Sequence, residues 1–175
     1  ECAKYCKRLN ITFLSSAFDV KSLNFLHKFK QQIFKVPSGE LTNFLYLKRL
    51  GNFNKKIFLS TGMSNINEID QAVNTLVKFG TKKKKITLLH CNTEYPTPFK
   101  DANLKAIISL RKKFNLEIGY SDHTESIEAS LAAVALGATV IEKHFTLSKK
   151  LKGPDHAASI EPKELRDLVV KIRNI

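Results

Sequence analysis

The sequence predicts an α/β protein built on a parallel sheet, and three features of its pattern support this. Short apolar runs of β type alternate with longer segments of helical periodicity. No two neighbouring β-type runs are joined by a tight hairpin turn, so antiparallel pairing has no support. The runs are continuously apolar, as at residues 86–89, which is typical of strands buried on both faces.

Each element follows from this alternation. Strands are predicted at residues 11–18, 33–36, 56–59, 86–90, 116–120 and 140–145. Helices are predicted at residues 20–31, 42–50, 66–79, 102–114, 126–136 and 162–172, and the first residues read as the end of another helix. Asn65 is a typical N-cap, Gly80 and Gly137 are typical residues just past a helix end, and Pro162 and Glu164 suit a first turn.

Such an alternation fits either an open doubly wound sheet or a (β/α)8 (TIM) barrel. The sequence has no Gly-rich dinucleotide turn, and polar residues follow nearly every predicted strand. A barrel gathers functional residues from all its strand ends, whereas an open sheet concentrates them at one switch point. We therefore predict one incomplete TIM barrel domain over residues 1–175, with about six of the eight βα units present and the first two missing. The first residue is not Met, so we expect a piece of a longer protein.

Composition limits the possible partners. The formal net charge is +13, but the lysines are scattered and their one run, residues 82–85, lies between a helix and a strand. We therefore expect no nucleic-acid binding, although a basic field can attract a phosphorylated anion. No apolar run reaches the roughly 18–20 residues needed to cross a membrane. Three cysteines without zinc spacing indicate reduced thiols in a cytoplasmic protein.

Histidines follow the last two predicted strands. His123 ends the phrase GYSDH and His144 ends VIEKH, 21 residues later, with a helix predicted between them. A strand, a helix and a second strand of this length form one βαβ unit, which brings both strand ends to the same edge. Two imidazoles there are a plausible pair of ligands for a divalent metal.

Six phrases resemble, in order, those of the sialic acid synthases. They are KVPSGE (35–40), LSTGM (59–63), LLHCNTEYP (88–96), GYSDHT (119–124), VIEKHFT (140–146) and GPDH (153–156). The resemblance extends from about Phe13 to the end of the chain. It implies an enzyme that condenses phosphoenolpyruvate with an N-acyl hexosamine and releases phosphate.

The resemblance also implies roles for individual residues. His123 and His144 are expected to hold a divalent cation, Mn²⁺ in the first place and Mg²⁺ or Co²⁺ otherwise, that polarises the aldehyde of the sugar. Phosphoenolpyruvate is expected to contact Lys35, Ser38, Ser60 and Ser121, with help from Ser16, Asn92 and Thr93. The sugar is expected to contact Glu40, Tyr95 and Asp155. Catalytic roles are expected for Lys35, Glu40 and His144.

Simpler explanations exist for several of these residues. Lys35 could reach the surface along an apolar stem, Glu40 could cap a helix, and Ser60 and Asp155 could stabilise turns. For His90 we expect a contact with the barrel wall or a neighbouring helix rather than catalysis.

The choice of sugar stays open. N-acetylmannosamine, giving N-acetylneuraminate, is the first expectation, and a di-N-acyl deoxyhexose, giving a legionaminic- or pseudaminic-type acid, is the second. A non-catalytic barrel that binds only metal or sugar phosphate is a third possibility. The resemblance implies three further parts that we expect to lie outside this sequence: a carboxylate on the first strand, a Lys-bearing segment after the second, and an antifreeze-like C-terminal domain. We expect a homodimer in the full-length protein.

Overall fold

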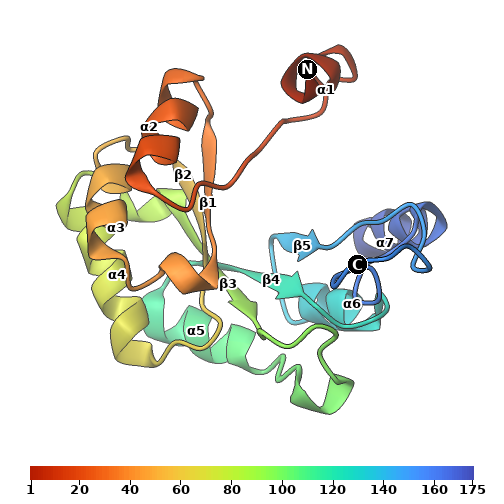
Figure 1. Ribbon diagram of the computed structural model, residues 1–175. Helices are drawn as coiled ribbons and strands as arrows, with labels where there is room; N and C mark the ends of the chain where they lie inside the picture. Colours follow the sequence, from red (N-terminus) through yellow and green to blue (C-terminus); the bar gives the residue numbers. More distant parts are fainter. The chain divides into compact units, whose positions relative to one another are not determined.

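The computed structural model describes all 175 residues. The chain divides into two compact units (Figure 1). The first unit comprises Glu1–Leu59 and Ser64–Ile86, and the second comprises Ser60–Met63 and Thr87–Ile175. None of the helices combines the length and the apolar character that a membrane-spanning segment requires.

In the first unit, two parallel strands carry a layer of helices. The strands are β1 (Ile33–Val36) and β2 (Lys56–Ser60), and Ile33 is paired with Lys56. The layer consists of α2 (Val20–Lys28), α3 (Phe44–Gly51) and α4 (Ile66–Lys78), whereas α1 (Cys2–Arg8) lies apart from it and has no buried residue (Figure 1). Short 3-10 turns form at η1 (Ser38–Glu40) and η2 (Lys83–Lys85). Helix α3 contacts both α2 and α4. A Cβ on Gly51 would lie 2.8 Å from Phe79 Cβ, so this close approach at the end of α3 requires glycine.

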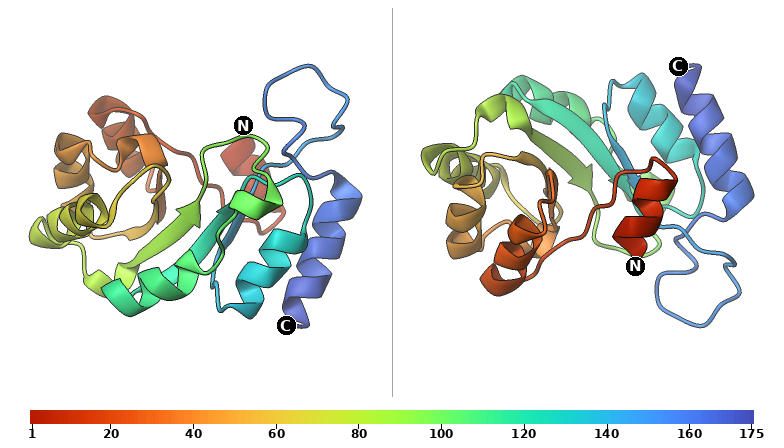
Figure 2. Two further views of the ribbon diagram at one scale, coloured as in Figure 1. Left: turned by 90° about the horizontal axis from the view of Figure 1, so that it is seen from below. Right: turned by 90° about the horizontal axis from the view of Figure 1, so that it is seen from above.

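In the second unit, three parallel strands pair in chain order. They are β3 (Ile86–Cys91), β4 (Glu117–Asp122) and β5 (Ile141–Lys143). Helices α5 (Ala106–Phe114), α6 (Glu128–Ala135) and α7 (Pro162–Arg173) accompany them, with a 3-10 turn at η3 (Phe99–Asp101). Helices α6 and α7 lie side by side (Figure 2) over a small core of Ile127, Ile160 and Leu168.

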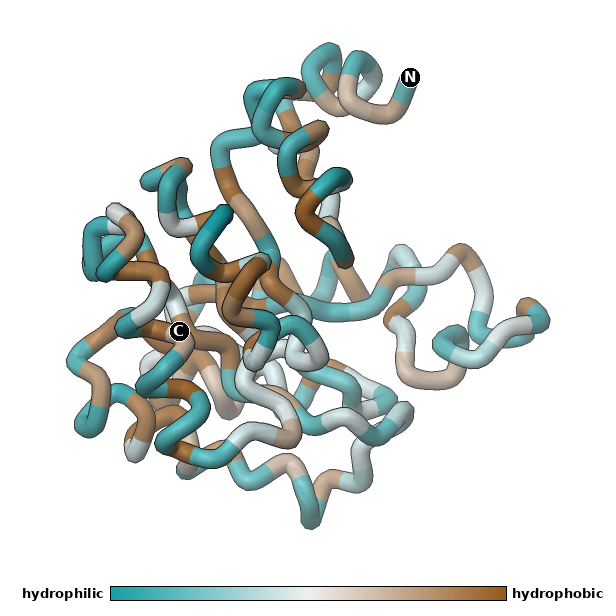
Figure 3. Tube along the Cα trace, turned by 60° about the vertical axis from the view of Figure 1, so that its left-hand side comes forward, coloured by the Kyte–Doolittle hydropathy of each residue, from teal (hydrophilic) through white to brown (hydrophobic).

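Helix ends form as their sequence signals predict. The Asn65 side chain accepts hydrogen bonds from the first turn of α4, and the Asn65 backbone N–H donates to Glu68 Oε2, which completes a capping box. Gly80, with φ +115°, and Gly137, with φ +91°, follow α4 and α6 in the positive-φ region that glycine adopts without strain. Apolar and polar stretches alternate along the helices (Figure 3), as expected for elements with one buried face.

The strand predicted at residues 11–18 does not form. This segment is extended, but its backbone makes no strand pairing, and Ile11 and Phe18 are exposed. Instead, the Gln31 side chain donates to Ser15 O at 2.9 Å and accepts from Ser15 N at 3.1 Å. The prediction of six strands is therefore wrong by one, because β-type composition forms a strand only where a neighbouring backbone can pair with it.

The other elements are confirmed, with displaced ends. Helix α5 begins at Ala106 rather than residue 102 because η3 occupies the preceding residues and Asn103 has φ +42°. Strand β5 is restricted to Ile141–Lys143, although residues 140–145 were predicted. Strands β1 to β4 match their predicted ranges to within two residues at each end.

Candidate functional site

The end of β4 presents alternate side chains to opposite faces of the sheet. Ser121 is the penultimate strand residue, and its hydroxyl lies 3.4 Å from His123 Nε2, so these two residues share a face. Asp122, between them, points to the other face. Glycine precedes them because a Cβ on Gly119 would lie 2.6 Å from both a Leu89 methyl and Val140 O.

His123 is held in one orientation. Its side chain is buried, its Nδ1 lies 2.6 Å from Asn92 O, and the Tyr95 ring stacks on it at 4.0 Å between ring centroids. Burial lowers the pKa of His123 below its ordinary value, although the Asn92 carbonyl opposes this effect. A neutral ring that donates from Nδ1 keeps the lone pair of Nε2 available for a ligand.

His144 lies beside His123, as the sequence predicts. The two ring centroids are 5.4 Å apart with an interplanar angle of 74°, and the Tyr95 ring is also 5.4 Å from His144. His144 Nδ1 lies 3.9 Å from Asp155 Oδ2, which is an ion-pair contact when the imidazole is protonated and is longer than a hydrogen bond. Both imidazoles therefore turn Nδ1 toward an oxygen acceptor.

Glu142 is a site residue that the sequence reasoning missed. It is paired with Ser121 across β4 and β5, and the Ser121 hydroxyl donates to Glu142 Oε1 at 2.7 Å. A carboxylate therefore lies on the same face as the two histidines. Its position two residues before His144 was the available signal, because alternate residues share a face. No cluster of three or more His, Cys, Asp or Glu side chains with metal-binding geometry is present.

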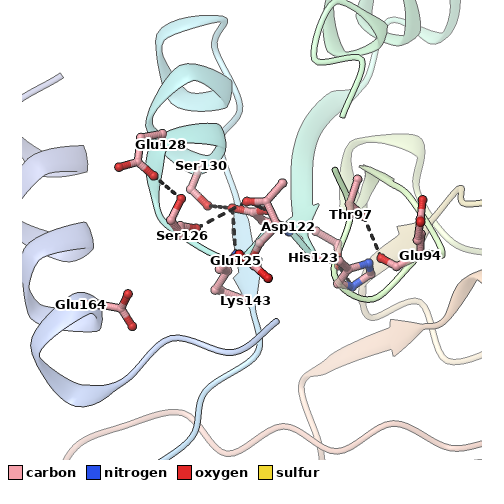
Figure 4. Close-up of polar contacts among 12 residues, drawn as sticks. Glu94, Thr97, Asp122, His123, Glu125, Ser126, Glu128, Ser130, Lys143 and Glu164 are labelled. Carbon is pink, nitrogen blue, oxygen red and sulfur yellow. Dashed lines mark hydrogen bonds and ion pairs between the residues drawn. The ribbon is translucent and has the colours of Figure 1, made fainter. Parts of the chain in front are cut away.

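On the opposite face, Asp122 and Lys143 form a buried ion pair (Figure 4), with Nζ 3.3 Å from Oδ2. Asp122 also accepts from Thr124 N and Oγ1, each at 2.8 Å, and from Ser130 Oγ at 2.5 Å. Lys143 donates to Thr124 O as well. Burial lowers the pKa of Lys143, and the neighbouring Asp122 carboxylate opposes this.

Two buried oxygens of the second unit have no hydrogen-bond partner in the chain. Ser60 Oγ, at the end of β2, is one, and its residue is only 2% exposed. Asn92 Oδ1 is the other, while its Nδ2 donates to Asp101 O at 2.8 Å. A buried polar atom without a partner is costly, so such atoms are candidates for contact with a ligand. Thr93, next to Asn92, is exposed.

The remaining predicted residues belong to the first unit. They are Ser16, Lys35, Ser38 and Glu40. Lys35 is largely buried in β1, with 9% of its surface exposed. Glu40 Oε2 accepts from Asn43 Nδ2 at 2.7 Å, and Asn43 caps α3, so Glu40 supports a helix start as the simpler explanation predicts.

Two further histidines have structural contacts. His90 Nε2 lies 2.8 Å from Ala102 O, and its ring stacks on Tyr120, which confirms the expected wall contact. Burial lowers the pKa of His90, so the neutral ring is favoured there. His156 Nδ1 lies 2.7 Å from Thr146 Oγ1 and ties together the two ends of the loop that carries Asp155.

Curated relatives include sugar-acid synthases from several organisms. An N,N'-diacetyllegionaminic acid synthase of Campylobacter jejuni is 57% identical over 175 residues, which are 100% of this chain and 52% of that protein. An N-acetylneuraminate-9-phosphate synthase of Drosophila melanogaster is 43% identical, covering 97% of this chain and 45% of that protein. A pseudaminic acid synthase of C. jejuni is 34% identical, covering 93% and 47%. The chain thus spans about half the length of these relatives.

Solved structures confirm the fold class. An N-acetylneuraminic acid synthetase of Leptospira borgpetersenii, crystallised with citrate, matches with a TM-score of 0.93 and 38% identity, covering 98% of this chain and 59% of that one. A phospho-2-dehydro-3-deoxyheptonate aldolase of Thermotoga maritima matches with a TM-score of 0.80 at 18% identity, which supports the fold alone. The chain is therefore an incomplete (β/α)8 barrel. The NeuB family model matches residues 1–175, and the chain belongs to the NeuB family.

Proposed function

We propose that the whole protein condenses phosphoenolpyruvate with an N-acyl amino sugar, releases phosphate and forms a nonulosonic acid. The observation that carries this proposal is the pair of imidazoles of His123 and His144, with ring centroids 5.4 Å apart, at adjacent strand ends. Membership of the NeuB family and the names of the relatives support the same reaction class.

A divalent cation is proposed to bind His123 and His144. The residues fit such an ion because Asn92 O engages His123 Nδ1, which leaves Nε2 as the ligand atom, and because Glu142 adds a carboxylate to the same face. Mn²⁺ is the first choice and Mg²⁺ or Co²⁺ the alternatives. When bound, the ion acts as a Lewis acid toward the aldehyde oxygen of the sugar.

The phosphate of phosphoenolpyruvate is proposed to contact Lys35, Ser38, Ser60 and Ser121. Ser60 supports this assignment, because its buried hydroxyl has no partner within the chain and a phosphate oxygen would accept from it. Lys35 supports it as well, because it lies in β1 and its ammonium group matches the charge of a phosphate. Ser16, Asn92 and Thr93 are proposed to complete the contacts of this substrate.

The sugar is proposed to contact Glu40, Tyr95 and Asp155. The Tyr95 phenol can donate to a sugar oxygen because tyrosine is protonated at neutral pH, and its partial burial raises its pKa further. In the reaction, the enol carbon attacks the aldehyde carbon, water adds to the resulting cationic carbon, and phosphate leaves. The chain contributes mainly by orienting the two substrates and by matching their charge.

The identity of the sugar has two candidates. The relative at 57% identity is named for N,N'-diacetyllegionaminic acid and favours a di-N-acyl deoxyhexose. N-acetylmannosamine is the alternative and matches the relatives named for N-acetylneuraminate.

One assay tests the reaction and the sugar together. The full-length protein is incubated with Mn²⁺, phosphoenolpyruvate and either sugar, while phosphate release and the mass of a new nine-carbon acid are followed. Product with only one sugar identifies the substrate. A folded, metal-loaded sample that releases phosphate with neither sugar would contradict the proposal and favour a barrel that only binds.

A lysine comparison tests the phosphate contact. We expect Lys35→Ala to raise the Michaelis constant for phosphoenolpyruvate by about tenfold or more, because a hydrogen bond to a charged group contributes about 1.5–3 kcal/mol. Lys55→Ala is the matched control, because Lys55 lies in the same unit and contacts Gln32 at 2.9 Å on the surface. Equal constants for the two variants would remove Lys35 from the phosphate site.

A further inference from the structure

The Asp122–Lys143 pair lies directly behind the two histidines. Asp122 and Lys143 are register partners across β4 and β5, and their side chains are 0% and 4% exposed. Their neighbours Ser121 and Glu142 are also register partners and bond to each other on the opposite face. Each member of the buried pair therefore has a site residue on both sides of it in the sequence.

The hydrogen bonds of the pair converge on the residue that follows His123. Asp122 accepts from both the backbone N–H and the hydroxyl of Thr124, and Lys143 donates to the carbonyl of Thr124. Asp122 also accepts from Ser130 of α6 at 2.5 Å. The backbone on either side of His123 is thus tied to β5 and to α6 at once.

Lys143 has the same relation to the second histidine, because His144 is the next residue. The Lys143 ammonium group lies 3.3 Å from Asp122 Oδ2 and donates to the Thr124 carbonyl, and both of these residues belong to β4 or follow it directly. These contacts fix the end of β5 against the end of β4. Neither member of the pair is accessible to a substrate, so a direct chemical role is excluded.

A buried ion pair is not explained by stability alone. Removing two charges from water is costly, and apolar residues of the same volume often stabilise a fold equally well. An ion pair with satisfied hydrogen bonds also fixes the orientation of the groups that it joins, because each bond restricts them to one geometry.

We propose that Asp122 and Lys143 are positioning residues that hold the backbones of His123 and His144 in register so that both imidazoles face one metal ion. This inference rests on the proposed metal site. Outer contacts of this kind typically change metal affinity by about 10- to 100-fold when they are lost.

The test uses the full-length protein with two lysine variants. Lys143→Met removes the buried charge, and Lys149→Met makes the same chemical change in the half-exposed ion pair with Glu164 of α7. Mn²⁺ affinity is measured by electron paramagnetic resonance. Long-range ¹H–¹⁵N spectra of ¹⁵N-histidine protein report the tautomer of each imidazole without metal.

We expect Lys143→Met to raise the Kd for Mn²⁺ by about 10- to 100-fold and to shift the metal-free signals of both His123 and His144. Lys149→Met should change neither. If Lys143→Met lowers the melting temperature while the Kd and the histidine signals match the wild type, the pair has only a structural role and the inference is overturned.

A double variant covers the case in which Lys143→Met does not fold. Asp122→Asn combined with Lys143→Met removes both charges, which avoids a buried unpaired carboxylate. It should fold, yet its Kd for Mn²⁺ should stay higher than that of the wild type, and its histidine signals should stay shifted. A double variant with wild-type values for both would overturn the inference.

Failure of the metal site is distinguishable from failure of this inference. A wild-type protein without Mn²⁺ affinity would contradict the proposed metal site. The metal-free histidine spectra would still decide the positioning role, because they compare Lys143→Met with Lys149→Met directly.

Discussion

The ends of β4 and β5 carry equivalent histidines in different surroundings. Strand β4 has six residues, five of them buried, whereas each of the three residues of β5 is partly exposed, although the Lys143 side chain itself is buried. His123 lies 2.6 Å from a backbone carbonyl and is 6% exposed. The His144 side chain is 34% exposed, and its Nδ1 lies 3.9 Å from Asp155 Oδ2.

This difference separates a preorganised side chain from an adjustable one. The orientation of His123 is determined by the fold, through burial and a short hydrogen bond. The orientation of His144 has fewer constraints, so a bound ligand can fix the final position of its imidazole. Changes at the two residues should therefore affect metal binding alike but affect stability differently.

The largest expected effect tests this contrast directly. His123→Ala and His144→Ala should each weaken Mn²⁺ binding by more than the roughly 10- to 100-fold typical of a lost outer contact. His123→Ala should also lower the free energy of unfolding of the metal-free protein by about 1–3 kcal/mol, because the partly buried Asn92 carbonyl loses its donor. His144→Ala should change it by less than about 0.5 kcal/mol.

Urea unfolding and Mn²⁺ titration of the full-length variants measure both quantities. Equal losses of stability would contradict the contrast between the two strand ends. Unchanged Mn²⁺ affinity in either variant would remove that histidine from the metal site.

A smaller effect is expected at Tyr95, whose ring stacks on His123 at 4.0 Å. Tyr95→Leu should lower the free energy of unfolding by about 0.5–1.5 kcal/mol, the usual contribution of an aromatic pair, and should broaden the His123 signal. Tyr95→Phe is the control, since it keeps the ring. If both variants behave alike, the ring does not orient His123.

The next smaller effect is expected in the pH dependence of stability. Burial lowers the folded-state pKa of His123, so the unfolded chain binds the proton more tightly. The stability contributed by the neutral ring is complete above the unfolded pKa near 6.5 and is lost as the pH falls through 6.5 toward the folded pKa. Metal-free protein should therefore lose stability between pH 7.5 and 5.

His123→Gln should show a weaker decline over the same range in urea unfolding. The half-buried His90 has a lowered pKa for the same reason and contributes equally to both proteins, so the difference between them isolates His123. Parallel curves for the two proteins would mean that His123 does not titrate below its unfolded value.

The smallest effect is expected for Asp155→Asn. The Asp155 side chain is 53% exposed, and exposed ion pairs contribute only about 0–1 kcal/mol. Stability should change by less than about 0.5 kcal/mol and the Kd for Mn²⁺ by less than about fivefold. If Asp155 contacts the sugar, the Michaelis constant for the sugar alone should rise. A large loss of Mn²⁺ affinity would instead make Asp155 an essential partner of His144.

Local signals were sufficient for most elements and for the histidine pair. The capping box at Asn65 and the positive φ at Gly80 depend on residues within one or two turns, so the sequence contains all that determines them. The meeting of His123 and His144 follows from one βαβ unit, whose connection rule is general.

Hydrogen-bond and ion-pair partners that lie far apart in the sequence could be identified only from the tertiary structure. The segment at residues 11–18 has the composition of a strand, but Gln31 bonds its backbone where a strand would be needed. The pairs Ser121–Glu142 and Asp122–Lys143 depend on the register between β4 and β5, because a shift of one residue would turn each side chain to the other face. The sequence alone determined the alternation of elements and the chemistry at each strand end, whereas packing determined which of those groups are buried against one another.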